Sequence, residues 1–344
     1  MSMLQPDPSS ADAQDHALRP QRLSEFTGQE QITRNLSVFV QAARARGDVL
    51  DHVFLSGPPG LGKTTLAAIL AREMGSPFRV TAAPALEKPK DLAGILTSLE
   101  EGAVFFIDEV HRLKPALEEM LYVAMEDFEL DWVIGQGPSA RSIRVPLPQF
   151  TLVGATTKPG RVSGPLFSRF GISQRLDLYD DGALGAIIAR SAGLLGVQLE
   201  QSALPLLARC ARGTPRVANR ILRRMRDFAE VEGDGRITPA VVESGLLRME
   251  IDGMGLERHD RAILRTLIEK FDGGPVGGET LAIAVGESVD TLEDFYEPYL
   301  IRIGMLDRTP RGRQATRSAW IHIGLSPPAE SRPAEDPDLF ADKE

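Results

Sequence analysis

The sequence predicts an α/β protein with three parts: a parallel-sheet domain, a small helical domain and a C-terminal winged helix. Residues 51–179 alternate short apolar runs with amphipathic helical stretches, as a parallel sheet with crossover helices requires. From residue 182 to about residue 248 only helical spacing remains. After Gly253 and Gly255, three helical stretches precede short Gly- and Arg-rich strands that continue to Gly324. This order is typical of a winged helix.

Length and composition agree with this organisation. The chain has 344 residues, of which 42% are hydrophobic and 25% charged, as in a folded protein. Its length predicts about two to three domains. One cysteine excludes a disulfide framework and a cysteine-based zinc site. No apolar run is long enough to span a membrane and no secretory signal is visible, so we expect a cytoplasmic protein without a membrane partner.

The acidic net charge of −9 is unevenly distributed. Residues 1–17 contain three Asp and no Lys or Arg, and residues 326–344 contain six acids against Arg332 and Lys343. Both segments are rich in small and polar residues, so we expect them to be disordered. Between residues 301 and 320, in contrast, five arginines face one acid. The acidic total therefore does not exclude nucleic acid as a partner.

These patterns fix the expected boundaries and elements. The expected parts are an acidic tail at 1–17, the sheet domain at 18–180 with a hairpin inserted at 130–147, the helical domain at 181–254, the winged helix at 255–325 and an acidic tail at 326–344. The expected strands are 52–55, 78–82, 103–107, 150–155 and 174–178. The expected helices include 62–74, 115–127, 257–271, 277–285 and 289–301.

A glycine-rich loop joins the first strand to the first of these helices. Gly57-Pro-Pro-Gly-Leu-Gly-Lys-Thr64 fits the phosphate-binding pattern GxxxxGK[ST] in its required context. Backbone N–H groups and the helix N-terminus would hold the phosphates of ATP, Lys63 would reach the β- and γ-phosphates, and Thr64 would hold Mg²⁺. The alternative is an ordinary turn into a helix, which the flanking elements disfavour. The expected ATP-binding residues of this segment are Gly57, Gly60, Leu61, Gly62, Lys63, Thr64 and Thr65.

Polar residues follow two other strands of the expected sheet. Asp108 and Glu109 end an apolar strand, which suits Asp108 for Mg²⁺ and Glu109 for polarising the attacking water. Two acids here could instead cap the next helix. Thr156 and Thr157 end another strand, at the sheet edge where ligands of open α/β folds bind. Threonine in a strand is usually only a good β-former, but this position favours a contact with the γ-phosphate or the water.

Together these motifs resemble those of a known family. The motifs are Phe106-Ile-Asp-Glu-Val-His-Arg, Gly154-Ala-Thr-Thr, Ser168-Arg-Phe-Gly, Arg212-Gly-Thr-Pro-Arg-Val-Ala-Asn-Arg, Tyr296-Glu-Pro-Tyr-Leu and Arg308-Thr-Pro-Arg-Gly-Arg. With the P-loop they resemble the RuvB family of AAA+ ATPases, the bacterial motors of Holliday-junction branch migration. The nucleotide motifs alone indicate only an AAA+ ATPase, whereas the hairpin and the C-terminal motifs indicate which AAA+ family the chain resembles. The resemblance covers about Leu18 to Leu325.

The resemblance implies further roles. Leu18 and Arg19 would line the adenine pocket, with Tyr179 and Pro215 near the base. Thr157, or its neighbour Thr156, would be sensor 1, and Arg216 would be sensor 2. Arg169 would be an arginine finger that completes the site of the neighbouring subunit, so hydrolysis would require a ring, expected to be hexameric.

The inserted hairpin is informative even without the resemblance. Leu130, Trp132 and Ile134 alternate onto one face of the strand that precedes a turn at 135–138, and a second strand follows that turn. This face could pack on its own domain or bind a partner. In the RuvB family the insertion docks the junction-binding protein RuvA, so Trp132 and Ile134 are the expected anchors.

The basic C-terminal segment predicts the DNA contacts. Arg308, Arg311 and Arg313 suit a wing that meets phosphates without reading bases, although a solvated charged loop is the alternative. Aromatic residues total only 6%, which favours double-stranded over single-stranded DNA. Gly278 stands where the family usually has Leu, which weakens one packing assumption in this module.

The expected function is an ATP- and Mg²⁺-dependent motor that encircles duplex DNA and drives branch migration of Holliday junctions in recombination and repair. Its expected partners are double-stranded DNA, the junction, a RuvA-type protein and a RuvC-type resolvase. A clamp-loader-type switch and a protein-remodelling AAA+ machine are the alternatives. A non-enzymatic DNA-binding scaffold is disfavoured, because Lys63, Asp108 and Glu109 are all present.

Overall fold

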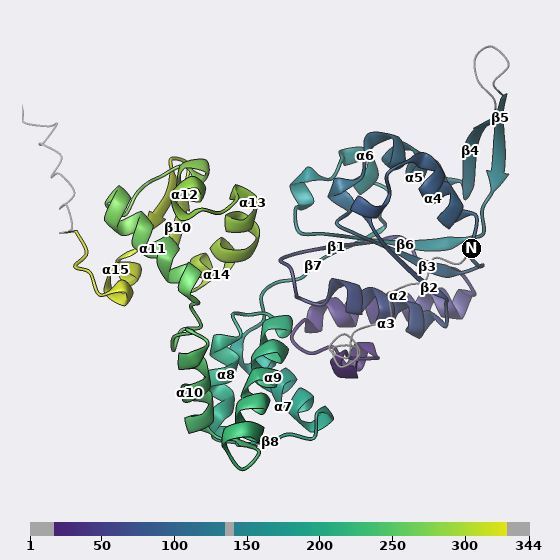
Figure 1. Cartoon of the computed structure of the whole chain (residues 1–344). Coiled ribbons are helices and arrows are strands. Elements are labelled where there is room, and N and C mark those ends of the chain that lie inside the picture. Colours follow the sequence, from purple (N-terminus) through teal and green to yellow (C-terminus); the bar gives the residue numbers. More distant parts are fainter. Residues whose placement is uncertain (1–16, 135–140, 329–344) are drawn as a thin grey trace, which may run out of the picture. The chain divides into compact units, whose positions relative to one another are not determined.

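The structure, a computed structural model, describes residues 17–134 and 141–328. It consists of two compact units, which divide between Gly255 and Leu256. The first unit holds the parallel sheet and a helical lid, and the second holds the winged helix (Figure 1). Within the described ranges, no helix has the length and apolar character needed to cross a membrane. The two expected acidic tails lie almost entirely outside the described residues.

A five-stranded parallel sheet in the order β2-β3-β6-β1-β7 forms the centre of the first unit. Its strands are β1 (Val53–Ser56), β2 (Phe78–Ala82), β3 (Ala103–Asp108), β6 (Phe150–Thr156) and β7 (Ile172–Arg175). The expectation of a strand at 174–178 was wrong by two to three residues. Arg175 pairs with Ser56, the last residue of β1, so the chain beyond Arg175 has no strand left to pair with. Leu176 instead joins the hydrophobic core below the sheet.

Helices cover both faces of this sheet because successive strand residues point to opposite sides. Val104 and Phe106 of β3 belong to one core cluster, whereas Phe105 and Ile107 belong to the other. The first cluster lies against α2 (Glu30–Arg46) and α3 (Lys63–Met74), and the second against α4 (Pro89–Leu96), α5 (Pro115–Glu126) and α6 (Gly164–Phe167) (Figure 1). Short 3₁₀ turns complete the domain: η1 (Leu23–Glu25), η2 (Ala83–Ala85), η3 (Val110–Arg112) and η5 (Pro159–Arg161).

The inserted hairpin is present between α5 and β6. Its strands, β4 (Glu129–Ile134) and β5 (Arg141–Pro146), pair antiparallel. The expected turn between them lies outside the described residues.

The lid is helical, with one small exception to the expected pattern. Its elements are α7 (Asp181–Leu194), β8 (Gln198–Leu199), η6 (Gln201–Ala203), α8 (Leu204–Cys210), α9 (Pro215–Glu232), β9 (Arg236–Ile237) and α10 (Pro239–Arg248). The two-residue strands β8 and β9 pair in parallel and were not expected, because two residues carry no detectable periodicity. Pro215 opens α9, and the Thr238 hydroxyl accepts the Val241 N–H at 3.3 Å to cap α10.

The winged unit contains the three expected helical stretches and a hairpin. Its elements are α11 (Arg258–Phe271), α12 (Gly278–Val285), α13 (Val289–Thr291), the π-helical segment η7 (Leu292–Tyr296), α14 (Glu297–Arg302), β10 (Leu306–Thr309), β11 (Gly312–Ala315) and α15 (Arg317–Ile323). The expectation of strands up to Gly324 was wrong for α15. Thr316 caps that helix by accepting the Ala319 N–H at 3.3 Å, and Gly324 ends it at φ +80°.

Candidate active site

The phosphate-binding loop is fixed to the sheet at its first glycine. The Gly57 N–H donates to the Thr156 carbonyl at 3.2 Å, which joins the loop to the end of β6. Gly57 has φ +137°, and a Cβ there would lie 2.3 Å from the Leu176 carbonyl oxygen. Only glycine therefore fits this position. The loop then enters α3 at Lys63, directly after Gly62.

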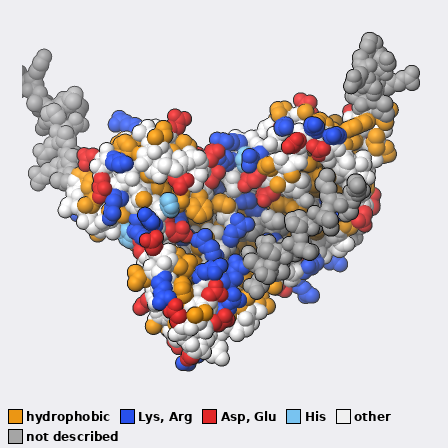
Figure 2. Space-filling model, in the orientation of Figure 1, with side chains coloured by type: hydrophobic (Ala, Val, Ile, Leu, Met, Phe, Trp, Pro, Cys, Tyr) orange, Lys and Arg blue, Asp and Glu red, His pale blue; other side chains and the backbone are white. Residues whose placement is uncertain are grey.

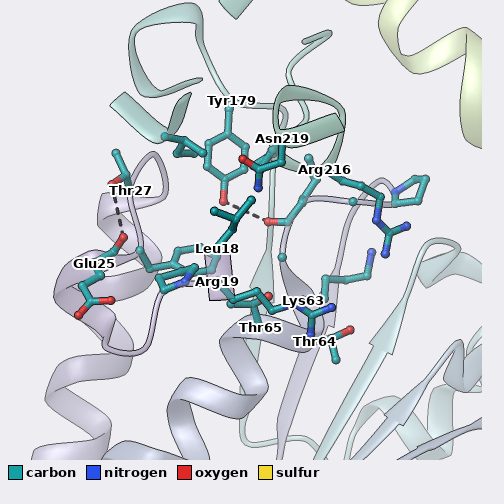
Figure 3. A pocket seen from close by; sticks show the side chains of 18 of the residues that line it. Leu18, Arg19, Glu25, Thr27, Lys63, Thr64, Thr65, Tyr179, Arg216 and Asn219 are labelled. Carbon is teal, nitrogen blue, oxygen red and sulfur yellow. Dashed lines mark hydrogen bonds between the residues drawn. The ribbon is translucent and has the colours of Figure 1, made fainter. Parts of the chain in front are cut away.

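A cavity of about 240 Å³ lies between this loop, the ends of the strands and the lid (Figure 3). Most of the expected nucleotide residues line it: Leu18, Arg19, Gly60, Leu61, Gly62, Lys63, Thr64, Thr65, Asp108, Glu109, Thr157, Tyr179, Pro215 and Arg216. Of the expected set, Gly57 and Arg169 do not line it. Residues from distant parts of the sequence thus meet at the carboxyl edge of the sheet, as the strand order requires.

Two cations face each other across the phosphate end of the cavity. In Figure 3 the ends of Lys63 and Arg216 point toward the same region. Lys63 is 7% exposed, and its ammonium donates to the Gly57 and Pro58 carbonyls at 2.8 and 3.0 Å. Burial lowers the pKa of Lys63, Glu109 and Asp108 counteract this, and Arg216 adds to it. An anion between the two cations would relieve their repulsion, so this end of the cavity suits a polyphosphate.

Thr64 and Asp108 fit the requirements of a magnesium ion. Both residues line the cavity and offer a hydroxyl and a carboxylate oxygen, the hard ligands that Mg²⁺ prefers. Glu109, the next residue, adopts φ +51° and ψ +46°, which is uncommon for a residue other than glycine. Its carboxylate accepts from the Thr157 N–H at 3.4 Å and the Thr157 hydroxyl at 3.3 Å. Sensor candidate Thr157 and catalytic candidate Glu109 are therefore in direct contact.

The part of the cavity around Leu18 and Tyr179 offers apolar surface that suits a base (Figure 3). Tyr179 is 2% exposed and donates its hydroxyl to the Leu61 carbonyl at 3.1 Å, and burial raises the pKa of the phenol. Leu18 is also buried, and its carbonyl accepts from the Arg190 guanidinium at 2.9 Å. Among further lining residues, Ile187, Arg190 and Asn219 were not singled out from the sequence. Helical spacing could have found Asn219, because it lies one turn after Pro215 and Arg216 on α9.

Family models match almost the whole described chain. The matches are the Holliday junction DNA helicase RuvB P-loop domain over residues 18–176, the RuvB AAA lid domain over 179–252 and the RuvB C-terminal winged helix domain over 253–324. The chain belongs to the RuvB family.

Individual RuvB proteins agree with this assignment. The Holliday junction branch migration complex subunit RuvB of Treponema denticola is 62% identical over 95% of this chain and 95% of its own length. Its counterpart from Borreliella burgdorferi is 57% identical over 91% and 90%. The solved Thermotoga maritima RuvB Holliday junction branch migration motor is 48% identical and superposes with a TM-score of 0.83 over 90% of this chain and 99% of that one.

Arg169, the expected arginine finger, is held by its own domain in this RuvB-family chain. Its guanidinium donates to the Pro165 carbonyl at 2.7 Å and to Glu126 at 3.1 Å, and lies 4.6 Å from the ring centre of Tyr122. It does not reach the cavity of its own chain. A role in a neighbouring subunit's site remains a prediction.

The apolar residues of the RuvB hairpin differ in their burial. Leu130 is buried in the domain core, and Trp132 is partly buried and packs against that core. Ile143, opposite Trp132 on the neighbouring strand, is 42% exposed and was missed because it lies among arginines in the sequence. The Ile134 side chain lies outside the described residues. Hydrophobic side chains are visible along the described part of this hairpin (Figure 2).

The three wing arginines divide into two groups. Arg311 is exposed at the β10–β11 turn, and Arg308 is exposed although it pairs with Glu293 at 3.0 Å. Arg313, in contrast, is 8% exposed and pairs with Glu297 at 2.7 Å and with Glu293 at 2.5 Å. The expectation that Arg313 faces phosphate is therefore not supported by its position. A Cβ at Gly278 would lie 2.5 Å from the Arg313 Nη1, so the glycine there makes room for this guanidinium.

Proposed function

We propose that this chain is the ATP-hydrolysing motor subunit of a complex that drives branch migration of Holliday junctions. The observation that supports it best is one cavity where Lys63, Asp108, Glu109 and Thr157 of the sheet domain meet Arg216 of the lid. Its relatives at 57–62% identity are named Holliday junction branch migration complex subunits. An ATPase whose lid contributes a cation to the phosphate site can change its lid position with the nucleotide.

The residues suggest how ATP is hydrolysed. Lys63 and the backbone N–H groups of the loop bind the phosphates, and Arg216 adds a second cation from the lid. Thr64 and Asp108 would hold Mg²⁺, which neutralises charge on the β- and γ-phosphates when bound. Glu109 orients and polarises the water that attacks the γ-phosphorus, and the bond to the β–γ bridging oxygen breaks to release ADP and phosphate. Thr157 lies beside Glu109, where it can contact the γ-phosphate or the water.

The assembly and partners belong to the same proposal. Arg169 would complete the site of a neighbouring subunit, so the active form is a hexameric ring around duplex DNA. The Trp132 face of the β4–β5 hairpin would bind a RuvA-type junction protein, and a RuvC-type resolvase would act on the same junction. Arg311 and Arg308 would contact phosphates of the duplex. The work would take place in the cytoplasm, where bacterial chromosomal DNA is found.

Two alternatives share the ATPase core. A clamp-loader-type switch would bind ATP and DNA without continuous translocation, and a protein-remodelling machine would use the core to grip polypeptide. The winged unit with exposed Arg311 favours a DNA motor over the remodelling machine. The inserted hairpin favours the motor over the switch, because it offers an apolar face for a second protein.

ATP-dependent dissociation of a synthetic four-way DNA junction tests the proposal. The assay is run with and without a RuvA-type protein, and with a Lys63→Ala variant as the control. Dissociation that requires ATP and Lys63, and that increases with the partner, supports the motor. Strong ATP hydrolysis without junction movement under any of these conditions would contradict it and favour the switch.

A further inference from the structure

His111 lies beside the site on the turn η3, which follows Asp108 at the end of β3 and the left-handed residue Glu109. Its Nδ1 atom is 3.1 Å from the Glu109 Oε2 and 2.8 Å from the Thr156 hydroxyl. The imidazole is 8% exposed and does not line the nucleotide cavity. It therefore contacts the candidate catalytic carboxylate from outside the cavity, where it would not touch ATP.

The protonation of His111 follows from these partners. A carboxylate oxygen can only accept a hydrogen bond, so the short contact with Glu109 is favourable only if Nδ1 carries the hydrogen. The Thr156 hydroxyl already accepts the Lys158 N–H at 2.9 Å, and as an acceptor it can share the same Nδ1 hydrogen. Burial lowers the pKa of His111, and the negative charge of Glu109 opposes this shift only in part. The neutral ring with hydrogen on Nδ1 is therefore the form at neutral pH.

Thr156 anchors the imidazole to the rest of the site. Its side chain is fully buried, and its carbonyl accepts the Gly57 N–H of the phosphate-binding loop at 3.2 Å. Thr157, the next residue, donates from its N–H and hydroxyl to the same Glu109 oxygen that faces His111. A closed set of hydrogen bonds thus joins the phosphate-binding loop, the end of β6, the η3 turn and Glu109.

A glutamate side chain has three rotatable bonds, and a catalytic base contributes only when its carboxylate is held near the reacting water. Thr157 holds Glu109 only weakly during the reaction, because its hydroxyl has one hydrogen and is also the expected donor to the γ-phosphate or the water. Only its N–H, at 3.4 Å, then remains on the carboxylate. His111 has no such competing role. Its partners, Thr156 and Glu109, are both internal to the protein.

We propose that His111 is the positioning residue for the catalytic carboxylate: anchored by Thr156, it holds Glu109 in place while Thr157 serves the nucleotide. This inference rests on the proposed role of Glu109 in hydrolysis. It predicts that His111 affects the rate of the chemical step and leaves ATP binding unchanged.

The test compares His111→Leu with His111→Asn in the full chain. The asparagine amide can place an N–H close to the Nδ1 position, whereas leucine has similar bulk and no donor. A hydrogen bond to a charged group corresponds to about a tenfold to hundredfold effect. We expect His111→Leu to lower kcat for ATP hydrolysis by about tenfold or more, and His111→Asn to restore most of it. KM for ATP and the Kd of a fluorescent ATP analogue should be unchanged in both.

Thr156→Val and Thr156→Ser provide an independent check on the anchor. The valine removes the hydroxyl and should lower kcat, the serine should keep it, and Thr156→Val combined with His111→Leu should be no slower than His111→Leu alone. His259→Leu, at an exposed histidine in the winged unit, is the matched control and should behave as wild type.

Three results would overturn the inference. They are a wild-type kcat in His111→Leu, equal losses of kcat and ATP affinity, or an asparagine variant as slow as the leucine variant. Glu109→Gln separates this failure from that of the proposed function. If Glu109→Gln hydrolyses ATP at the wild-type rate, the role of Glu109 is wrong and the inference falls with it. If Glu109→Gln is inactive and His111→Leu is not, only the inference is wrong.

Discussion

Replacing Arg313 with alanine should destabilise the winged unit far more than it weakens DNA binding. Arg313 bridges Glu297 and Glu293 through its Nε and Nη2 atoms, at 2.7 and 2.5 Å. The side chain of Glu297 is only 3% exposed. Without Arg313, the Glu297 carboxylate stays buried with its main charge partner removed.

The size of the effect follows from this burial. Removing one partner of a buried ion pair costs about 3 to 5 kcal/mol, because the remaining charge is neither solvated nor paired. Arg308 lies 3.8 Å from the same carboxylate, but it is 54% exposed and compensates only weakly. We therefore expect a loss of about 3 kcal/mol for Arg313→Ala, against less than about 0.5 kcal/mol for Arg311→Ala at the exposed turn.

Urea unfolding of the full chain can measure this loss in the winged unit alone. The chain contains two tryptophans, so a Trp132→Phe background leaves Trp320 of α15 as the only indole. Its fluorescence then reports the winged unit.

A paired variant provides the control. Arg313→Met with Glu297→Leu removes both charges and should be more stable than Arg313→Ala alone. An Arg313→Ala variant that keeps the parent's unfolding midpoint but loses duplex affinity would refute the structural role and return Arg313 to the DNA-contacting residues.

Four further predictions concern the site, the ring, the wing and pH. Lys63→Ala should abolish ATP binding, whereas Glu109→Gln should bind ATP and stop hydrolysis by at least about a hundredfold; equal loss of binding in both, measured with a fluorescent nucleotide, contradicts this division. Arg169→Ala subunits should bind ATP yet inhibit mixed rings more than in proportion to their share, and simple dilution of activity on titration counts against a role between subunits. Arg311→Ala should reduce the slope of log affinity against log salt for duplex DNA by about 1 without changing sequence preference, as measured by fluorescence anisotropy. Burial lowers the folded-state pKa of His52, so below about pH 6.5 the unfolded chain takes up a proton first and stability falls as the pH drops; His52→Gln should flatten this dependence in a series of urea titrations.

The sequence was sufficient for the sheet domain and for most of its cavity. Strong apolar runs and a motif with fixed spacing locate Lys63, Asp108 and Thr157, and a parallel sheet necessarily brings the ends of their strands together. The boundary of β7 was less predictable, because the apolar residues Leu176 and Leu178 continue into the core after the pairing has ended. Hydrophobicity reports burial there, and burial does not require a strand.

The orientation of charged side chains could not be predicted from the sequence. Arg311 and Arg313 are two residues apart in one basic motif, yet one is exposed and the other is buried. Strand alternation would have placed residues two apart on the same face, but Arg311 lies in the turn before β11, and only the structure shows that Glu293 and Glu297 lie behind the second arginine. The contact between His111 and Glu109 is another example, because it depends on the left-handed turn at Glu109, which no motif specifies.

Tyr179 connects the phosphate-binding loop to the lid at a single residue. Its hydroxyl binds the Leu61 carbonyl of the loop at 3.1 Å, and its backbone N–H binds the Gly213 carbonyl, just before α9, at 2.9 Å. A shift of the loop relative to the lid at this point would therefore stretch or break one of these two hydrogen bonds. The 18-residue helix α9 begins next to this connection and extends for about 27 Å. A rigid helix of this length would amplify motion: a rotation of about 10° at the nucleotide end would displace its far end by about 5 Å.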